Sequence, residues 1–327
     1  MKKILLQLDV DPQPCSFDAV VAVDAGADVL LQHGNVSPKN VVSLIHGAMF
    51  TRAGSDLAST SIFLGGKNIA QVEEIASQIS NTFFNSVRVS VLIDPAGANT
   101  TAAATVIAAK RHISFQPSTK SKACQALVLG GTGPVGQRVS RLLANQGAHV
   151  HLASRSFERA SQHCKLLNKN FPLARLEPTS IKMLEKVIGS VDLIVSAGGP
   201  GVEMLTEAQL SQAISTTVCI DLNAVPPAGI TGIQATDTAR RDGTKILYDA
   251  IGVGERKMKL HKAAIQQLFQ TNDQWLDAEE LLTIAEKVDV SNEQKSKYVL
   301  EKIVTKRHRF SLASQGSQLA SLVQVQQ

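Results

Sequence analysis

The chain has 327 residues, of which 44% are hydrophobic and 4% aromatic. This length and composition predict a globular protein with room for two domains, each with its own apolar core. No apolar run is long enough to cross a bilayer, so we expect no membrane partner. The formal net charge is +5, but residues 291–327 hold six basic and two acidic side chains, which leaves the rest almost neutral. A nearly neutral body gives no electrostatic reason to expect nucleic acid as a partner.

The cysteines indicate a reducing environment rather than a metal centre. They are Cys15, Cys124, Cys164 and Cys219, and none of them forms a C-x-x-C pair. Widely spaced cysteines without such pairs are typical of free thiols. We therefore expect a cytoplasmic protein with no metal site.

Strand-like and helix-like segments alternate through residues 3–113. The apolar segments expected as strands are Ile4–Leu8, Asp28–Gln32, Ser59–Leu64 and Val87–Ile93. The segments with helical periodicity are Phe17–Ala25, Pro38–Phe50, Ile69–Phe84 and Thr100–Ile113. This alternation predicts a mostly parallel sheet covered by helices, and therefore an N-terminal α/β domain over residues 1–115.

A glycine-rich turn follows the polar linker Gln116–Lys122. The apolar strand Gln125–Gly130 ends in Gly131-Thr-Gly-Pro-Val-Gly136, which leads into the helical segment Gln137–Gln146. In a dinucleotide site the first glycine permits the turn, the second admits the phosphate, and the third lets helix and strand pack closely. The helix N-terminus then offers unpaired N–H groups to the pyrophosphate. The alternative is an ordinary strand–turn–helix of an unrelated α/β sheet.

The turn predicts a Rossmann-like dinucleotide-binding domain over residues 123–250. The expected cofactor contacts come from Gly131, Thr132, Gly133, Pro134, Val135 and Gly136. The end of the next strand, His149–Ala153, indicates which dinucleotide binds. Sites that prefer NAD usually carry an acid there, whereas this chain has Ser154-Arg155-Ser156. Arg155 and Ser154 can bind a phosphate, so we expect NADP, with NAD as the alternative. In the other interpretation, Arg155 is solvated and Ser156 caps the helix Phe157–Asn168.

Two later loops complete the expected cofactor site. The strands Val191–Val195 and Val218–Asp221 end in the loops Ser196–Gly199 and Leu222–Gly229. Ligands of open α/β sheets bind at such carboxyl ends of strands. The expected contacts here come from Ser196, Ala197, Gly198, Asn223 and Pro226. Turn formation is the alternative explanation for the glycines and prolines of these loops.

The C-terminal part is expected to be helical and then irregular. Helical patterns cover Gly252–Phe269 and Ala278–Val288, and we expect residues 251–290 to pack back toward the first domain. The basic tail over residues 291–327 is rich in Gln and Ser after Phe310, so we expect it to be partly disordered.

Several unusual stretches occur in an order typical of one enzyme family. They are Gln7-Leu-Asp-Val-Asp11, Ser16-Phe-Asp18, His33-Gly-Asn-Val-Ser-Pro38, Asn99-Thr-Thr-Ala-Ala-Ala104, Gly131-Thr-Gly-Pro-Val-Gly136, Asn223-Ala-Val-Pro-Pro-Ala-Gly-Ile230, Gly252-Val-Gly254 and Lys257-Met-Lys-Leu-His261. On these stretches, which span residues 1–288, the chain resembles the NAD(P)-dependent methylene-tetrahydromethanopterin dehydrogenases of one-carbon metabolism.

The resemblance implies transfer of a hydride from the methylene carbon of a reduced pterin to a nicotinamide, which leaves a methenyl pterin cation. The carbon that loses the hydride lies between two nitrogens whose lone pairs stabilise the positive charge, so no proton has to move. Catalysis can then depend on alignment of the reactants, with the cofactor supplying the chemistry. A sequence without a convincing catalytic triad, metal site or carboxylate pair suits such a reaction.

The resemblance also implies a pterin site between the two domains. Its expected residues are Asp9, Asp11, His33, Asn35, Asn99, Thr100, Thr101 and His261. The aspartates follow the first strand, where they could accept pterin N–H groups or favour the cationic product, or could simply cap the loop. For His33 and Asn35 the alternative is a role in a turn. The three residues from Asn99 open a helix with small side chains that would admit a flat ring, or that simply form a well-capped helix.

The Lys-x-Lys-x-His run carries the expected catalytic residues, Lys257 and Lys259. On a helix, Lys257 and His261 share a face, while Lys259 points elsewhere. A cationic lysine beside a carbon that becomes cationic would oppose the reaction. The simpler role is therefore to bind an anionic part of the pterin or cofactor, or to contact the pterin as a partly desolvated lysine with a lowered pKa. Solvated helix lysines are the alternative interpretation.

Departures from the family pattern leave other functions open. Leu222 stands where an aromatic residue is expected, and Glu255 and Arg256 replace smaller or apolar residues, so tetrahydrofolate could replace tetrahydromethanopterin. A non-catalytic NADP-binding sensor is a further alternative. Tyr298-x-x-x-Lys302 has the spacing of short-chain dehydrogenases but falls in the tail. We expect no cyclohydrolase activity, because the first domain has no tyrosine, and we expect a homo-oligomer, the common case for such enzymes.

Overall fold

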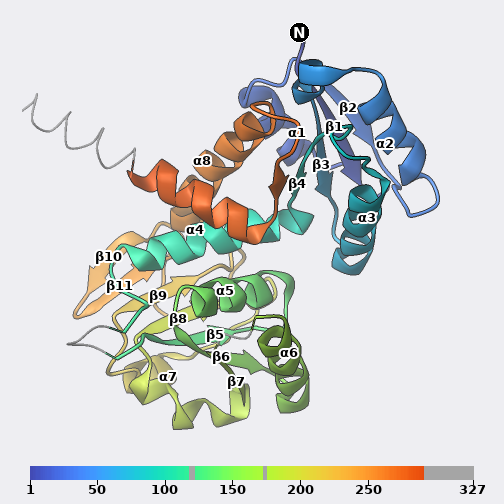
Figure 1. Ribbon diagram of the computed structural model, residues 1–327. Helices are drawn as coiled ribbons and strands as arrows, with labels where there is room; N and C mark the ends of the chain where they lie inside the picture. Colours follow the sequence, from blue (N-terminus) through green and yellow to red (C-terminus); the bar gives the residue numbers. More distant parts are fainter. Residues whose placement is uncertain (118–121, 172–174, 291–327) are drawn as a thin grey trace, which may run out of the picture. The chain divides into compact units, whose positions relative to one another are not determined.

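The computed structural model describes residues 1–117, 122–171 and 175–290 (Figure 1). Met1–Ala285 group into one compact unit that holds two β-sheets, and Glu286–Gln327 form a second unit. The expected tail over residues 291–327 and the Tyr298/Lys302 pair lie outside the described residues. The division into four segments expected from the sequence remains a prediction.

The first sheet contains only parallel strand pairs. Its strands are β1 (Ile4–Asp9), β2 (Val29–His33), β3 (Thr60–Gly65), β4 (Ser90–Ile93) and β12 (Trp275–Leu276), in the spatial order β12-β4-β3-β1-β2. This is the doubly wound order 2-1-3-4-5, in which the sheet changes winding direction between β1 and β3. The last strand, β12, follows the whole second sheet in the chain, so the first sheet is completed by residues far from its other strands in sequence.

Helices cover both faces of the first sheet. The helices α1 (Ser16–Asp24), α2 (Val41–Phe50), α3 (Ile69–Thr82) and α4 (Ala98–Lys110) alternate with its strands. On one face Ile45 of α2 and Ile75 of α3 pack with Leu64 of β3, and all three are fully buried. The opposite face meets a later helix, because Ser61 Oγ donates a hydrogen bond to the Leu268 carbonyl at 3.2 Å. The buried residues of α3 recur with helical spacing, as its amphipathic pattern requires.

The second sheet has seven strands. They are β5 (Gln125–Leu129), β6 (His149–Ser154), β7 (Arg175–Ser180), β8 (Leu193–Ser196), β9 (Val218–Asp221), β10 (Thr238–Asp242) and β11 (Lys245–Tyr248). The spatial order is β10-β11-β9-β8-β5-β6-β7, and only the β10–β11 pair is antiparallel. Without β10 this is the Rossmann order 3-2-1-4-5-6. The predicted α/β class, with a mostly parallel sheet and a Rossmann-like sheet, is confirmed.

The second sheet is also covered on both faces. The helices α5 (Pro134–Asn145) and α6 (Phe157–Asn170) pack along β6 and β7. The other face holds an apolar core shared with α7 (Glu207–Gln212) and two short 3₁₀ segments, Ile181–Lys186 and Ile188–Ser190. Two more 3₁₀ segments, Gly54–Ser59 and Pro95–Gly97, lie in the first half of the chain.

The helices α4 and α8 (Ala250–Leu268) link the two sheets within the compact unit. The helix α8 starts beside β10 and packs against α4, α1 and β4, after which the chain adds β12 to the first sheet. The Asp249 carboxylate caps α8 by accepting a hydrogen bond from the Gly252 N–H at 2.8 Å. Residues 278–290 form a further helix.

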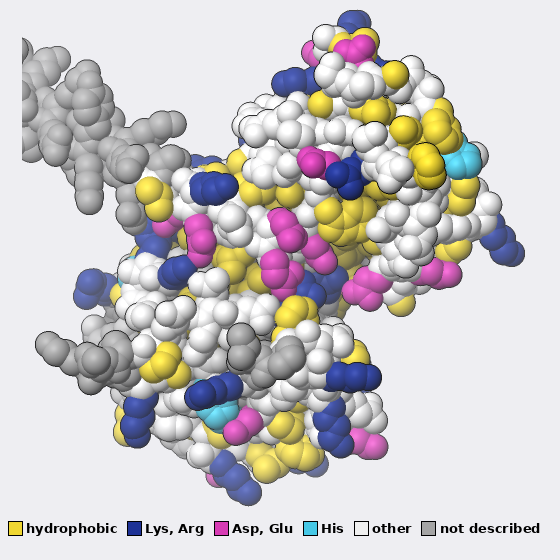
Figure 2. Space-filling model, in the orientation of Figure 1, with side chains coloured by type: hydrophobic (Ala, Val, Ile, Leu, Met, Phe, Trp, Pro, Cys, Tyr) yellow, Lys and Arg dark blue, Asp and Glu magenta, His cyan; other side chains and the backbone are white. Residues whose placement is uncertain are grey.

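Surface properties agree with the composition. On the face shown in Figure 2, basic and acidic side chains are interspersed, in keeping with the nearly neutral body. Among the described helices, none combines the length and the hydropathy needed to span a membrane.

Candidate functional site

The glycine-rich turn leads from β5 directly into α5. Gly130 has a φ of +68°, and a Cβ there would lie 2.6 Å from the Ala197 carbonyl oxygen. A Cβ on Gly136 would lie 2.8 Å from Gly131 Cα, so side chains are excluded where helix and strand cross. Pro134 occupies the first turn of α5 behind Gly133, which leaves the first N–H groups of the helix without intrahelical partners. A helix start of this kind, behind a glycine-rich turn, is where anions such as a pyrophosphate bind in Rossmann sheets, and Val135 lies in the same turn.

The end of β6 borders this turn. Ser154 Oγ lies 3.2 Å from Thr132 Oγ1, so the two hydroxyls stand side by side. Arg155 follows as an exposed residue, and Ser156 caps α6 by accepting the Arg159 N–H at 3.2 Å. The capping role that sequence reasoning offered as the alternative for Ser156 is therefore present. Arg155 is joined to this pair only by its place in the chain, directly after Ser154.

The loops after β8 and β9 are organised by a buried carboxylate that sequence reasoning missed. Asp221 Oδ2 accepts the N–H groups of Gly229 and Ile230 at 2.6 and 3.1 Å, and Oδ1 accepts that of Asn223 at 3.1 Å. Burial raises the pKa of Asp221, and these three backbone donors oppose the rise. Asn223 is also used within the loop, since its Nδ2 donates to the Pro227 carbonyl at 2.9 Å.

The remaining residues of these loops lie at the same edge of the sheet. The Ala197 N–H donates to the Leu129 carbonyl at 2.9 Å, which places the Ser196–Gly198 segment beside the glycine turn. Pro226 is exposed in the loop that Asp221 holds. Since β5 and β8 are neighbours at the point where the strand order reverses, this edge is where a Rossmann sheet binds its ligand.

A second edge, in the first sheet, collects acidic residues. Asp9 ends β1 and is 1% exposed, and its carboxylate accepts the N–H groups of Asp11 and Cys15 at 2.8 and 3.1 Å. This is the loop-capping role that sequence reasoning left open. Asp11 is partly exposed and lies 4.0 Å from the Lys67 ammonium.

The residues after β2 form a turn that packs on the same loop. Asn35 has a φ of 51°, and its N–H donates to the Asp11 carbonyl at 2.8 Å. Its own carbonyl accepts Asn40 Nδ2 at 3.0 Å. His33 is half-buried at the end of β2. The contacts of Asn35 are those of a turn residue.

Asp94, which directly follows β4, organises the start of α4. Its Oδ1 accepts the N–H groups of Asn99 and Thr100 at 2.9 and 3.1 Å, and its Oδ2 accepts Thr100 Oγ1 at 2.6 Å. Thr101 Oγ1 donates to the Gly97 carbonyl at 2.6 Å. Asn99 and Thr100 are completely buried, and the Thr100 hydroxyl and both backbone N–H groups bond the Asp94 carboxylate at the helix start. The well-capped helix that was the alternative interpretation describes these contacts.

Three elements converge on Lys257. The helix α8 supplies Lys257 and, one turn later, His261, while α1 supplies Phe17 and β3 supplies Phe63. The Lys257 ammonium lies 5.6 Å from the centroid of the exposed Phe17 ring. A Cβ on Gly97 would overlap the same ammonium, so only glycine leaves room for it. These residues, together with Asp18 of α1, form what we term the Lys257 cluster.

His261 is the most unusual member of the Lys257 cluster. It is 0% exposed, and its ring stacks on Phe63 at 5.6 Å between centroids and 26° between planes. Neither ring nitrogen has a hydrogen-bond partner among the described residues. A buried imidazole without partners is costly in a folded protein, so these nitrogens are candidates to contact a ligand.

The charges in the Lys257 cluster influence one another. Burial raises the pKa of Asp18 from 3.8 to about 6, Asp94 adds to the rise, and Lys257 opposes it. Burial lowers the pKa of His261, with Lys257 acting in the same direction and Asp94 against it. Near neutral pH the cluster therefore offers a neutral imidazole beside an ammonium and a carboxylate that holds its proton more tightly than usual.

Lys259 lies apart from this cluster. Its ammonium forms an ion pair of 2.6 Å with Glu255, one turn back on α8, and both side chains are at least half exposed. Of the two expected catalytic lysines, the structure brings only Lys257 together with the other candidate residues. The solvated interpretation describes the surroundings of Lys259.

A separate group of possible metal ligands lies on β6 and β7. His149, His151 and Glu177 each place one potential ligand atom within 4.8 Å of the others. His149 Nε2 lies 3.1 Å from a Glu177 oxygen, and burial lowers the pKa of His151. The three side chains could hold a divalent ion, but they sit away from the carboxyl ends of the strands where the cofactor turn lies.

The two sheets, the glycine-rich turn and the Lys257 cluster together indicate a class of enzyme. The chain is a two-sheet α/β protein of the nicotinamide-nucleotide-dependent dehydrogenase type, with a dinucleotide turn at one sheet and a polar cluster at the other. Residues 16–96 match the family described as methylene-tetrahydromethanopterin dehydrogenase, N-terminal, and residues 107–239 match shikimate/quinate 5-dehydrogenase.

Two curated relatives come from Methylorubrum extorquens. The bifunctional protein MdtA is 38% identical over 289 residues, which cover 88% of this chain and 99% of that protein. The NAD(P)-dependent methylenetetrahydromethanopterin dehydrogenase is 31% identical over 262 residues, which cover 79% and 88%. The chain therefore belongs to the methylene-tetrahydromethanopterin dehydrogenase family of enzymes. Among solved structures, quinate dehydrogenase from Corynebacterium glutamicum in complex with NAD has a TM-score of 0.46 at 15% identity, covering 88% and 99% of the two chains.

Proposed function

We propose that this enzyme oxidises methylene-tetrahydromethanopterin to methenyl-tetrahydromethanopterin with NADP⁺ as the hydride acceptor. The observation that carries the proposal is the presence, in one compact unit, of a dinucleotide turn and of the Lys257 cluster, whose buried His261 lacks partners among the described residues. The relatives named for this reaction support the choice of pterin. Bound NADP⁺ would supply the carbon that accepts the hydride.

In this proposal the Lys257 cluster receives the pterin. The carbon that loses the hydride becomes part of a cation, and the ionised Asp18 carboxylate would stabilise that charge in surroundings largely shielded from water. The exposed Phe17 ring offers a flat surface for the pterin ring. Lys257 and the neutral His261 would hold polar pterin atoms by hydrogen bonds. No residue has to accept a proton from the reacting carbon, so the protein contributes position and charge.

The choice of NADP over NAD is supported by the residues beside the turn. Arg155 is exposed and directly follows Ser154, whose hydroxyl lies 3.2 Å from that of Thr132, and β6 ends in Ser154 rather than in an acidic residue. A guanidinium and two hydroxyls suit a 2′-phosphate, which a carboxylate would repel. The free thiols of all four cysteines support a reducing compartment, which we propose to be the cytoplasm.

The test is an absorbance assay with purified protein. Methylene-tetrahydromethanopterin and NADP⁺ should give NADPH and the methenyl product in equal amounts, and parallel reactions with NAD⁺ and with methylene-tetrahydrofolate rank the cofactors and carriers. Lys257→Met should raise the pterin KM by about tenfold or more, whereas Lys259→Met, the matched control from the solvent face of α8, should behave as wild type. Absence of nucleotide reduction with either carrier would overturn the proposal and favour a sensor.

We also propose that the enzyme is a homo-oligomer. Val20 and Val23 on α1 are 62% and 60% exposed, and Leu31 on the neighbouring end strand β2 is 43% exposed. Exposed apolar side chains on the edge strand of a sheet and on the helix beside it are typical of subunit contacts. Light scattering after gel filtration should give a multiple of 34.9 kDa, and Val20→Glu should reduce that mass. A wild-type protein that elutes as a monomer at working concentration would contradict this.

A further inference from the structure

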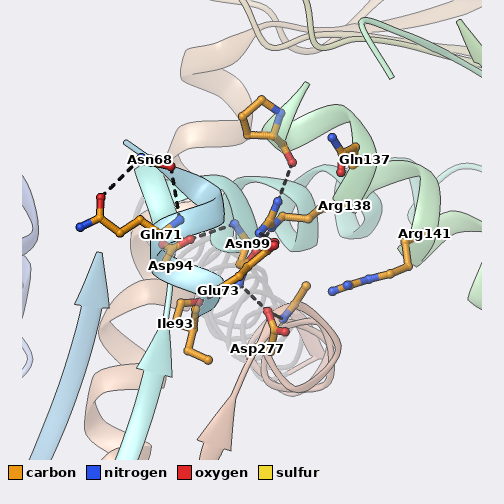
Figure 3. Close-up of polar contacts among 12 residues, drawn as sticks. Asn68, Gln71, Glu73, Ile93, Asp94, Asn99, Gln137, Arg138, Arg141 and Asp277 are labelled. Atoms are coloured by element: carbon orange, nitrogen blue, oxygen red, sulfur yellow. Dashed lines mark hydrogen bonds and ion pairs between the residues drawn. The ribbon is translucent and has the colours of Figure 1, made fainter. Parts of the chain in front are cut away.

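Arg138 connects the dinucleotide turn to the first sheet. It lies on α5, one turn after the glycine-rich turn, and it is only 8% exposed (Figure 3). Its Nη1 donates to the Pro134 carbonyl at 3.1 Å, its Nε donates to Asn99 Oδ1, and its Nη2 donates to Glu73 at 3.4 Å. One planar group therefore binds the first turn of α5, the start of α4 and the helix α3.

Asn99 extends this connection in two further directions. Its Nδ2 donates to the Ile93 carbonyl at the end of β4 at 2.7 Å, and to Asp277 at 2.6 Å. Its N–H donates to Asp94 at 2.9 Å. Asp94 raises the pKa of Asp18 and influences His261, so it lies within electrostatic reach of the Lys257 cluster. A continuous hydrogen-bonded path thus runs from the turn through Arg138 and Asn99 to Asp94.

Burying the charged Arg138 guanidinium costs free energy, which favours a role for Arg138 besides packing. Burial lowers the pKa of Arg138, while Asp277 and Glu73 oppose that change, and a guanidinium stays charged throughout. Replacing a buried charge by a well-packed apolar side chain is often neutral or stabilising, so a buried ionic group is weak support for a purely stabilising role. What a guanidinium offers and an apolar side chain lacks is a rigid set of donors that fixes several acceptors at set positions.

We propose that Arg138 is a positioning residue that couples the two ligand sites of this enzyme. This inference rests on the proposed function, because it assumes that nucleotide binds at the turn and pterin at the Lys257 cluster. Nucleotide bound at the first turn of α5 restrains Pro134, and Arg138 passes that restraint to Asn99 and Asp94. The pterin then meets a cluster that is already ordered. By thermodynamic linkage each ligand should tighten the binding of the other by the same factor.

The same helix offers a matched control. Arg141 lies one turn further along α5 and also pairs with an acid, since its Nη2 donates to Glu279 at 2.8 Å. It lies 5.4 Å from the Phe171 ring centroid. These contacts of Arg141 involve neither Pro134 nor Asn99. Arg141→Met should therefore cost stability like Arg138→Met, without loosening the link between the two ligand sites.

The experiment measures coupling in a complex that cannot react. The affinity for NADP⁺ is measured by calorimetry without and with saturating methenyl-tetrahydromethanopterin, in wild type, Arg138→Met, Arg138→Lys and Arg141→Met. Wild type and Arg141→Met should show at least about fivefold tightening. Arg138→Met and Arg138→Lys should show less than about twofold, because lysine keeps the charge and lacks the planar donors. Affinities for each ligand alone should stay close to wild type.

The outcomes separate this inference from the proposed function. If the Arg138 variants retain wild-type coupling, if wild type shows none, or if Arg141→Met loses coupling equally, the positioning role is wrong even though turnover of wild type stands. If wild type neither binds nor oxidises the pterin, the proposed function fails instead. If Arg138→Met does not fold, Arg138→Lys and Asn99→Ser test the positioning role instead. Arg138→Lys keeps the positive charge at this position, and Asn99→Ser leaves Arg138 itself unchanged; both should lose the coupling.

Discussion

The substitution Asp18→Asn separates the stability of the fold from the chemistry of the site. Burial raises the pKa of Asp18 from 3.8 to about 6, a difference of about two units, which corresponds to about 3 kcal/mol when both folded and unfolded states are ionised. The folded pKa is the higher one, so the folded state holds the proton more tightly. The contribution of Asp18 to the free energy of unfolding is therefore most favourable below pH 3.8. It is lost as the pH rises through about 6 and does not change further above that pH.

Asparagine has nearly the same shape and no charge to desolvate. At about pH 8 the free energy of unfolding of Asp18→Asn should exceed that of wild type by up to about 3 kcal/mol, and at about pH 4 the two should differ by less than about 1 kcal/mol. Hydride transfer at the higher pH should slow by about tenfold or more, because the carboxylate no longer faces the developing cation. The variant should thus be more stable and less active.

Urea denaturation at several pH values tests the predicted stability of Asp18→Asn. Single-turnover kinetics on the same samples test the predicted loss of hydride transfer. Asp24→Asn is the matched control, since Asp24 ends the same helix and forms an exposed ion pair of 2.7 Å with Lys262. Its effect should stay within about 1 kcal/mol at every pH. The reasoning is refuted if Asp18→Asn is less stable than wild type at high pH. Wild-type turnover in Asp18→Asn would remove Asp18 from the chemistry.

Two further predictions concern the nucleotide site. Gly136→Ala should destabilise the fold by about 1–3 kcal/mol and abolish NADP⁺ binding, because its Cβ would lie 2.8 Å from Gly131 Cα. Gly254→Ala is the control: its Cβ would have no atom within 4 Å, so the variant should be neutral or stabilising by about 0.5–1 kcal/mol. Urea midpoints and nucleotide titrations compare the two glycine variants. Equal effects of both would contradict the close approach of α5 to the glycine-rich turn at Gly136. Arg155→Ala should raise the KM for NADP⁺ by about tenfold or more and that for NAD⁺ by less than about twofold, while Arg159→Ala should change neither. Equal losses for both nucleotides would remove Arg155 from the 2′-phosphate site.

Local patterns explain which strands could be predicted. The segment Ser59–Leu64 matches β3 within one residue, because a strand buried on both faces is a continuous apolar run. The strand β7 was missed, since Arg175–Ser180 contains Pro178 and lies at the end of its sheet, where a proline is tolerated. The strand β12 has two residues and exists only because it pairs with β4 from a distant part of the chain. No local pattern predicts such a pairing.

In the candidate site, too, features within one short stretch could be predicted, and features that join distant parts of the chain could not. The glycine turn could be predicted because every group that defines it lies within one short stretch. Asp94 and Asp221 were missed, although Asp94 directly follows an apolar strand and Asp221 ends one, as Asp9 does, and that position was an available signal. Arg138 gave no signal, because a lone arginine on an amphipathic helix is usually solvated, and its role depends on partners far away in sequence.

Two of the expected substrate residues make contacts that the sequence could not predict. The Asn99 side chain bonds Arg138, Asp277 and the Ile93 carbonyl, and the Thr100 hydroxyl bonds Asp94, while their part in pterin binding stays a prediction. Asp18 belongs to one of the stretches that carry the resemblance, yet its importance follows from burial beside Lys257, which only the packing of α1 on α8 creates.

In the proposed reaction a hydride passes directly between two aligned ligands without exchange with water. The decisive measurement uses methylene-tetrahydromethanopterin in which both methylene hydrogens are deuterium, with NADP⁺ and purified protein, followed by mass spectrometry of the reduced nucleotide and the water. Each reduced nucleotide should carry one deuterium, and none should reach the water. Deuterium in the water, or reduced nucleotide that contains only hydrogen, would contradict direct transfer.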